Sequence, residues 1–140
     1  MSTVFTKIIE GELPGVFVWR DERCVAFLSI NPIATGHTLI VPIEEVDHWV
    51  DGSPELVAHL FEVTRVIGVA QRDAFRCDRV GVILAGYEVP HAHVHVIPTR
   101  DMSDLSFANA ATSVPRSDLE AAAERIRGAL RAAGHSAVSG

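Results

Sequence analysis

Three histidines stand at every second position in an otherwise apolar run, EVPHAHVHVIP, which covers residues 88–98. Side chains on a β-strand point alternately to its two faces, so His91, His93 and His95 are predicted to share one face of a strand. Adjacent neutral imidazoles can serve as nucleophile, as acid or base, and as metal ligands. Three charged rings in a row would repel one another, so we expect that they are not all protonated at neutral pH. The spacing favours a strand face that carries chemistry over an exposed polar face.

A fourth histidine, His37, opens another β-rich run, GHTLIVP. Further β-rich runs, separated by turn residues, bring the number of expected strands to five. The strands are predicted over residues 16–20, 24–30, 37–42, 79–86 and 91–98.

Two helices are predicted after the third and fifth strands. Ser53 is a suitable N-cap, and apolar residues at spacings of three and four continue from it to about Ala74. Ser117 and Glu120 form a capping box for a last helix over about 117–133, which precedes a frayed tail at 135–140. Strands and helices in this order are typical of an α+β fold with a mainly antiparallel sheet.

Length and composition narrow the class of protein. A chain of 140 residues is predicted to form one domain, residues 1–140. Its formal net charge of −6 disfavours a protein that coats nucleic acid, because such a protein needs basic surface. No run approaches the ~18 apolar residues of a membrane span, and the start lacks the apolar core of a signal peptide. The two cysteines, Cys24 and Cys77, form no metal-binding spacing and suit a reducing compartment. We therefore expect a cytoplasmic protein that binds neither nucleic acid nor membrane.

Four sequence elements, in order, resemble the histidine triad (HIT) superfamily of nucleotide hydrolases and transferases. They are FTKIIEGELP, VAFLSI, GHTLIVP and HAHVHVI, and the resemblance covers about residues 4–100. It implies a HIT-like fold, with a five-stranded antiparallel sheet, a central helix and a C-terminal helix, and a homodimer as the assembly. It also implies attack on the α-phosphorus of nucleoside phosphoramidates or dinucleoside polyphosphates, through a nucleotidyl-histidine intermediate.

The resemblance assigns roles to individual residues. His93 would be the nucleophile, His91 and His95 would flank it to bind phosphate and hold its ring, and His37 would lie behind them in a hydrogen-bonded relay. No metal or cofactor is needed, because covalent catalysis divides the displacement into two steps. An apolar slot for the base would be lined by five residues, for which plain core packing is the equal alternative: Phe5, Ile8, Leu13, Phe27 and Ile30.

The chain departs from the family pattern beside the triad. The phosphate loop lacks its usual Asn and is shortened, although Gly86 retains the glycine whose amide can approach a phosphate. Tyr87 stands where Gln is common, and Ser29 stands where an Asp often accepts the ribose hydroxyls. Glu88 lies next to the triad, where it would either steer substrate amines or simply be solvated. These departures motivate one alternative, a nucleotide-binding or interaction module with little turnover.

A second alternative is a zinc hydrolase with three histidine ligands, because HxH on a strand presents two ligands together. Many bacterial relatives carry a Cys-x-x-Cys that forms half of a structural zinc site. The matching residues here are Thr3 and Thr6, with His48 as a possible further match, and without thiolates we expect no zinc there. His48 is expected at the surface together with two other histidines, His59 and His135.

Overall fold

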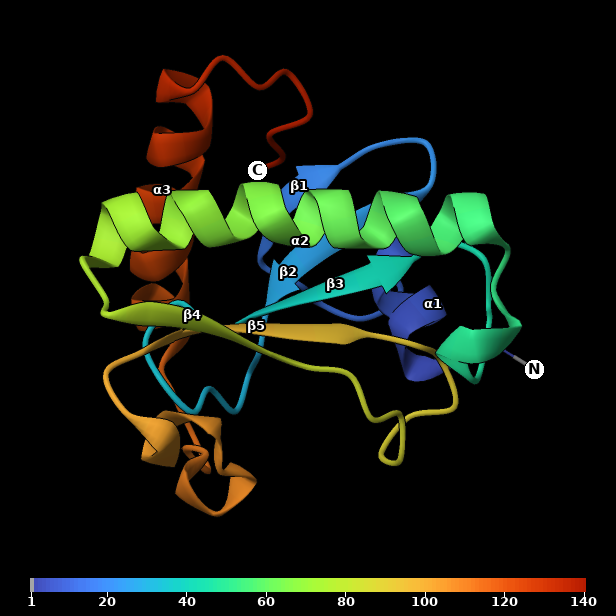
Figure 1. Ribbon diagram of the computed structural model, residues 1–140, viewed down its shortest axis with the longest axis horizontal. Helices are drawn as coiled ribbons and strands as arrows, with labels where there is room; N and C mark the ends of the chain where they lie inside the picture. The colour runs from blue at the N-terminus through green and yellow to red at the C-terminus, as the bar shows by residue number, and fades with distance from the viewer. Residues whose placement is uncertain (1) are drawn as a thin grey trace.

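The computed structural model describes residues 2–140 and has an α+β fold built on one antiparallel sheet, as the sequence predicts (Figure 1). The five strands lie in the order β1-β2-β3-β5-β4. Their bounds are β1 Phe17–Arg20, β2 Cys24–Leu28, β3 Thr38–Pro42, β4 Arg79–Ile83 and β5 Val94–Thr99. The α-helices are α1 Val4–Ile9, α2 Pro54–Phe75 and α3 Arg116–Ala132. Short 3-10 helices are η1 Trp49–Asp51, η2 Met102–Leu105 and η3 Phe107–Asn109.

The central strands bury both of their faces. In Figure 1 the long helix α2 crosses one face of the sheet, and α3 packs beside it. Alternate residues of β2 and β3, such as Ala26 and Ile40, join the large core under α2. Their neighbours Phe27 and Leu39 instead pack with Phe5 of α1 in a smaller core on the other face. The small core leaves room for a cavity beside α1, which is described below.

The helix ends agree with the sequence in part. The hydroxyl of Ser53 accepts the Leu56 N–H at 3.1 Å, so the predicted start of α2 is confirmed. The predicted capping box of α3 is wrong, because the helix already begins at Arg116, after Pro115, and no side chain caps it. Helix α1 was not expected from the sequence; its N-cap is Thr3, whose hydroxyl accepts the Thr6 N–H.

The histidine run is only partly a strand. β5 begins at Val94, and β4 ends at Ile83, so both strands are shorter than predicted. His91 and His93 therefore lie in irregular chain before β5, where the N–H of Ala92 donates to the Val46 carbonyl at 2.6 Å. Strand alternation accounts for His95 alone. The His91 ring is placed by hydrogen bonds to the Pro42 carbonyl of β3 and to the Thr3 hydroxyl, and the His93 ring by a hydrogen bond to the His91 carbonyl.

The C-terminal segment is ordered against β1, and the prediction of a frayed tail is wrong. Val138 forms a β-bridge with Trp19. The Arg20 N–H donates to Ala137 at 2.9 Å, and the Ser139 N–H donates to Val18 at 3.1 Å. One outer edge of the sheet, that of β1, is therefore covered. Within residues 2–140 no strand pairs with the outer edge of β4.

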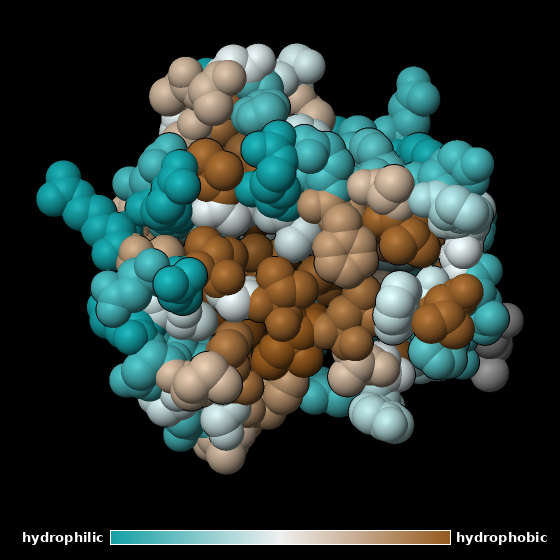
Figure 2. All heavy atoms as spheres, in the orientation of Figure 1, coloured by the Kyte–Doolittle hydropathy of each residue, from teal (hydrophilic) through white to brown (hydrophobic). Residues whose placement is uncertain are grey.

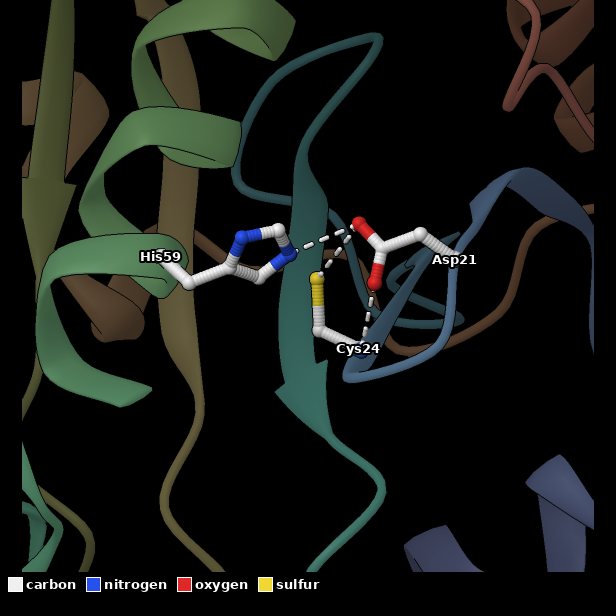
Figure 3. A group of neighbouring side chains, drawn as sticks. All are labelled: Asp21, Cys24 and His59. Carbon is white, nitrogen blue, oxygen red and sulfur yellow. Dashed lines mark hydrogen bonds and ion pairs between the residues drawn. The ribbon is translucent and has the colours of Figure 1, made fainter. Parts of the chain in front are cut away.

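Asp21, Cys24 and His59 form a polar cluster where the β1–β2 turn meets α2 (Figure 3). One carboxylate oxygen of Asp21 accepts from His59 Nε2 and from Trp19 Nε1, each at 2.8 Å. Burial opposes ionisation of Asp21, but these bonds and two backbone N–H donors lower its pKa to about 2. Burial raises the pKa of the Cys24 thiol, which stays protonated. The cluster joins the turn to α2, and His59, expected at the surface, is partly buried by it.

The sequence predicts His48 and His135 at the surface and no helix that spans a membrane. His48 is exposed, as predicted, whereas His135 is partly buried and stacks edge-on against Trp19 with 5.5 Å between ring centroids. In the described part of the chain, no helix has both the length and the apolar character needed to cross a membrane.

Candidate active site

A cavity of about 550 Å³ opens between α1, β2, β3 and the segment that contains η3. It contains every residue predicted for the base slot, with Phe27 in its floor and Ile30, 69% exposed, at its mouth. The other lining residues that the sequence predicted are Ser29, His37, Glu88, His93 and His95. Lining residues that it did not predict include Val4, Leu39, Val89, Phe107 and Ala110. The predicted slot thus shares one space with His37, His93 and His95.

His93 presents one unprotonated nitrogen in this cavity. Its Nδ1 lies 2.8 Å from the backbone carbonyl of His91. A carbonyl only accepts, so Nδ1 carries the proton and donates it, and in the neutral ring Nε2 is left with a free lone pair. Nε2 has no protein partner within residues 2–140. The Phe5 ring meets the His93 ring edge-on, with centroids 4.9 Å apart, and fixes its tilt.

His37 and His95 form a buried hydrogen-bonded pair. The Ile33 N–H donates to His37 Nδ1 at 3.0 Å, so the proton of neutral His37 is on Nε2. His37 Nε2 then donates to His95 Nδ1 at 2.9 Å, which leaves the proton of His95 on its own Nε2. Burial lowers the pKa of His37 to about 4. Burial, with smaller contributions from His37 and His93, lowers the pKa of His95 to about 3. Both rings are therefore neutral at physiological pH, and His95 is a hydrogen-bond donor beside His93.

His91 has a different place from the one the resemblance implies. Its ring is fully buried and does not line the cavity, so it is not placed to bind phosphate. Its Nε2 donates to the Pro42 carbonyl at 2.7 Å, and its Nδ1 accepts from the Thr3 hydroxyl at 2.7 Å. Burial lowers its pKa, which keeps the ring neutral. What His91 offers to the site is its backbone carbonyl, which orients His93.

These assignments leave few nitrogens for a metal. Both nitrogens of His91 and of His37 are engaged, and among the four rings only Nε2 of His93 and Nε2 of His95 lack a partner within residues 2–140. Three histidine ligands for zinc are therefore not available, which counts against the zinc-hydrolase alternative. Thr3 and Thr6 match the cysteines of the zinc site in bacterial relatives. Here they contact Glu45 rather than His48. Two hydroxyls and one exposed carboxylate are a poor set for zinc.

The shortened phosphate loop borders a second, smaller cavity of about 160 Å³. Gly86 adopts a φ of +86°, a left-handed conformation that favours glycine, and Tyr87 is 96% exposed. Glu88, His93 and His95 line both cavities, so His93 and His95 lie between the two spaces. No lysine or arginine of the described chain lines either one. A phosphate there would meet the imidazole N–H of His95 and the side chain of Glu88, and no lysine or arginine.

Phe107 is a site residue that the sequence did not reveal. It belongs to η3, lines both cavities, and meets the His95 ring edge-on with centroids 4.9 Å apart. It lies between the predicted fifth strand, residues 91–98, and the predicted last helix, about 117–133, where no element was assigned. The signal in the sequence was a single aromatic residue in the run SFANAA, residues 106–111. Nothing in that run indicates that it packs against the histidines.

Comparisons with known proteins show the family and the fold of this chain. The family model for the HIT domain matches residues 10–102. A HIT-like protein of Mycobacterium tuberculosis is 32% identical over 135 residues, which cover 93% of this chain and 94% of that protein. A zinc-bound histidine triad family protein from Mycobacterium smegmatis aligns with a TM-score of 0.81 at 29% identity, covering 95% of this chain and 96% of its own. A hypothetical histidine triad nucleotide-binding protein from Sulfolobus tokodaii aligns with a TM-score of 0.79 at 29% identity, covering 91% of each chain.

Proposed function

The chain belongs to the histidine triad (HIT) family, and from that premise we propose that it is a nucleotide hydrolase or transferase. The proposed reaction takes place at the α-phosphorus of a nucleoside phosphoramidate or a dinucleoside polyphosphate. It passes through a covalent nucleotidyl-histidine intermediate on His93, and it needs no metal or cofactor.

One observation carries the proposal: His93 brings an unprotonated, unpartnered Nε2 to a largely apolar cavity. A volume of about 550 Å³ lies within the usual range for small-molecule sites. The apolar walls beside Phe5 and Phe27 suit a planar base, and the hydroxyl of Ser29 is in place to meet a ribose. A nucleoside held in this way would bring its α-phosphate to the triad.

The proposed chemistry has two steps that balance in protons. In the first, His93 Nε2 forms a bond to phosphorus while the bond to the leaving group breaks. The leaving group takes its proton from water in the cavity, which leaves hydroxide, while His95 Nε2 donates a hydrogen bond to it. In the second, water attacks phosphorus, its proton neutralises that hydroxide, and the bond to His93 breaks. His37 holds His95 in the tautomer that donates, because its own proton is directed at His95 Nδ1.

A second candidate is a nucleotide-binding module with little turnover. The absence of lysine and arginine from the linings of both cavities favours it, because a phosphoryl group gathers charge that basic side chains usually stabilise. The two candidates share the bound nucleotide and differ in whether product forms.

The proposed assembly is a homodimer formed through the edge of β4. The β1 edge is covered by the C-terminal segment, whereas β4 has a strand on one side only within residues 2–140. Hydrophobic side chains gather below α2 in the view of Figure 2, over β4 and β5. Phe61 of α2 and Val82 of β4 are 42% and 44% exposed. A second copy that pairs its own β4 here would satisfy the edge and cover apolar surface.

The test is release of AMP from an adenosine phosphoramidate, followed by chromatography, with and without a chelator. We expect chelator-resistant release by the wild type and none by His93→Ala, which should still bind AMP. Activity retained by His93→Ala would remove the nucleophile assignment. Binding of AMP by a wild type that releases no product would establish the binding module instead. Release that chelation abolishes, with stoichiometric zinc in the protein, would revive the metal mechanism.

A further inference from the structure

A chain of hydrogen bonds runs from Glu45 through Thr3 to His91, behind the proposed nucleophile. One oxygen of Glu45 accepts the Thr3 N–H at 2.9 Å and the Thr6 hydroxyl at 2.5 Å. The Thr3 hydroxyl lies 2.7 Å from His91 Nδ1 and accepts the Thr6 N–H at 3.1 Å. None of these residues except His91 belongs to the triad, and neither Thr3, Thr6 nor Glu45 lines the cavity.

The acceptors at the two ends of this chain of hydrogen bonds determine which group donates in each bond. The Pro42 carbonyl can only accept, so the proton of neutral His91 is on Nε2 and its Nδ1 must accept. The Thr3 hydroxyl therefore donates to His91. The Glu45 carboxylate also only accepts, and the hydrogen bonds of Thr3 and Thr6 lower its pKa, so it is ionised. The Thr6 hydroxyl, at 3.3 Å, is a second and longer contact of the Thr3 hydroxyl. The bond to Pro42 permits one tautomer of His91, and its Nδ1 is the nearer acceptor for Thr3.

The anchoring of the His91 ring by these bonds matters because of what His91 does for His93. The His91 carbonyl accepts the Nδ1 proton of His93 and so keeps Nε2 unprotonated. A fully buried His91 ring, held on both nitrogens, fixes the orientation of this carbonyl. The same threonine caps α1, and α1 carries Phe5, which meets the His93 ring edge-on. Thr3 therefore acts on two of the contacts that orient His93.

We propose that Thr3, supported by Glu45 and Thr6, is a positioning residue that sets the tautomer and orientation of His93 through His91. This inference rests on the proposed function, because the tautomer it maintains is the one that a nucleophilic His93 requires. Thr3 touches neither the cavity nor the reacting atoms, so its influence on the reaction passes entirely through His91 and α1.

The experiment compares Thr3→Val, which keeps the shape and loses the hydroxyl, with Thr3→Ser, which restores the hydroxyl. Thr112→Val, at an exposed threonine outside the network, is the matched control. Nitrogen NMR of the imidazole rings reports which nitrogen carries the proton. In the wild type we expect a proton on His93 Nδ1 and on His91 Nε2. In Thr3→Val we expect a mixture of His93 tautomers, which Thr3→Ser returns to the single form.

Steady-state kinetics on the phosphoramidate provide the second measurement. Loss of the Thr3 hydroxyl leaves the buried Nδ1 of His91 without a hydrogen-bond donor, which costs free energy. We therefore expect kcat of Thr3→Val to fall about tenfold or more, with KM changed less than about twofold. Glu45→Gln, which keeps an acceptor oxygen and disturbs folding less, should give a smaller loss of the same kind. Thr3→Ser and Thr112→Val should behave as the wild type.

The two measurements separate this inference from the proposed function. A wild-type His93 tautomer in Thr3→Val, or a Thr3→Ser variant that does not restore it, would overturn the positioning role. If the wild type has no turnover, the proposed function fails, and the NMR comparison still decides whether Thr3 positions His93. An equal loss of kcat in Thr112→Val would also overturn the inference.

Discussion

Acidification should destabilise the protein through the buried pair of His37 and His95. Burial lowers their pKa values to about 4 and about 3, whereas an unfolded histidine titrates near about 6.5. Between these values the unfolded chain binds more protons than the folded one, so stability falls as the pH drops below about 6.5. The loss levels off below the folded pKa values, where both states are protonated.

The size of the effect follows from linkage. When the pH is lowered from 7 to 5, each of these rings stays neutral in the folded state and becomes protonated in the unfolded state. Each ring thereby lowers the free energy of unfolding by about 2 kcal/mol, or about 4 kcal/mol for the pair. Urea unfolding at the two pH values, followed by tryptophan fluorescence, measures this difference. Trp19 is a suitable reporter because it is buried in β1 and becomes exposed on unfolding.

Two variants test the origin of the loss. His37→Asn keeps an acceptor for the Ile33 N–H and removes one titrating ring. The free energy of unfolding of this variant should therefore fall by only about 2 kcal/mol between pH 7 and pH 5. His48→Asn, at an exposed position, should lose as much as the wild type. A wild type that loses less than about 1 kcal/mol, or a His37→Asn variant with the full loss, would refute the reasoning.

Two further changes test the backbone and the cavity wall. Gly36→Ala should lower stability by about 2 kcal/mol or more, because Gly36 has a φ of +93° and a Cβ there would meet the Phe75 ring. Gly128→Ala, in α3 with open space around it, should instead raise stability by about 0.5–1 kcal/mol, and thermal unfolding that ranks the two the other way would contradict this account. Phe107→Ala should raise KM about tenfold and change kcat less, because it removes a wall shared by both cavities. An unchanged KM in steady-state assays would place Phe107 outside the substrate site.

The sequence predicted what depends on residue type and short spacing. The strands and the start of α2 were visible in runs of a few residues, and the family resemblance named five residues that line the large cavity. It did not predict the real place of His91, because the bond from Thr3 to His91 joins residues 88 positions apart. Phe107 and the C-terminal segment were missed for the same reason, since each is placed by contacts with distant chain. Alternation along a strand predicted that three histidines would gather, but not which atoms they would present.

The covered β1 edge limits how copies of this chain can add to one another. An antiparallel sheet with two open edges can grow at both, and repeated addition of that kind produces filaments. Here the segment around Val138 occupies one edge, so within residues 2–140 only β4 presents an open edge to a neighbour. Two chains that paired through β4, as proposed, would leave covered edges at both ends, and the sheet would stop growing. Under that proposal, self-association through the sheet would end at a closed pair.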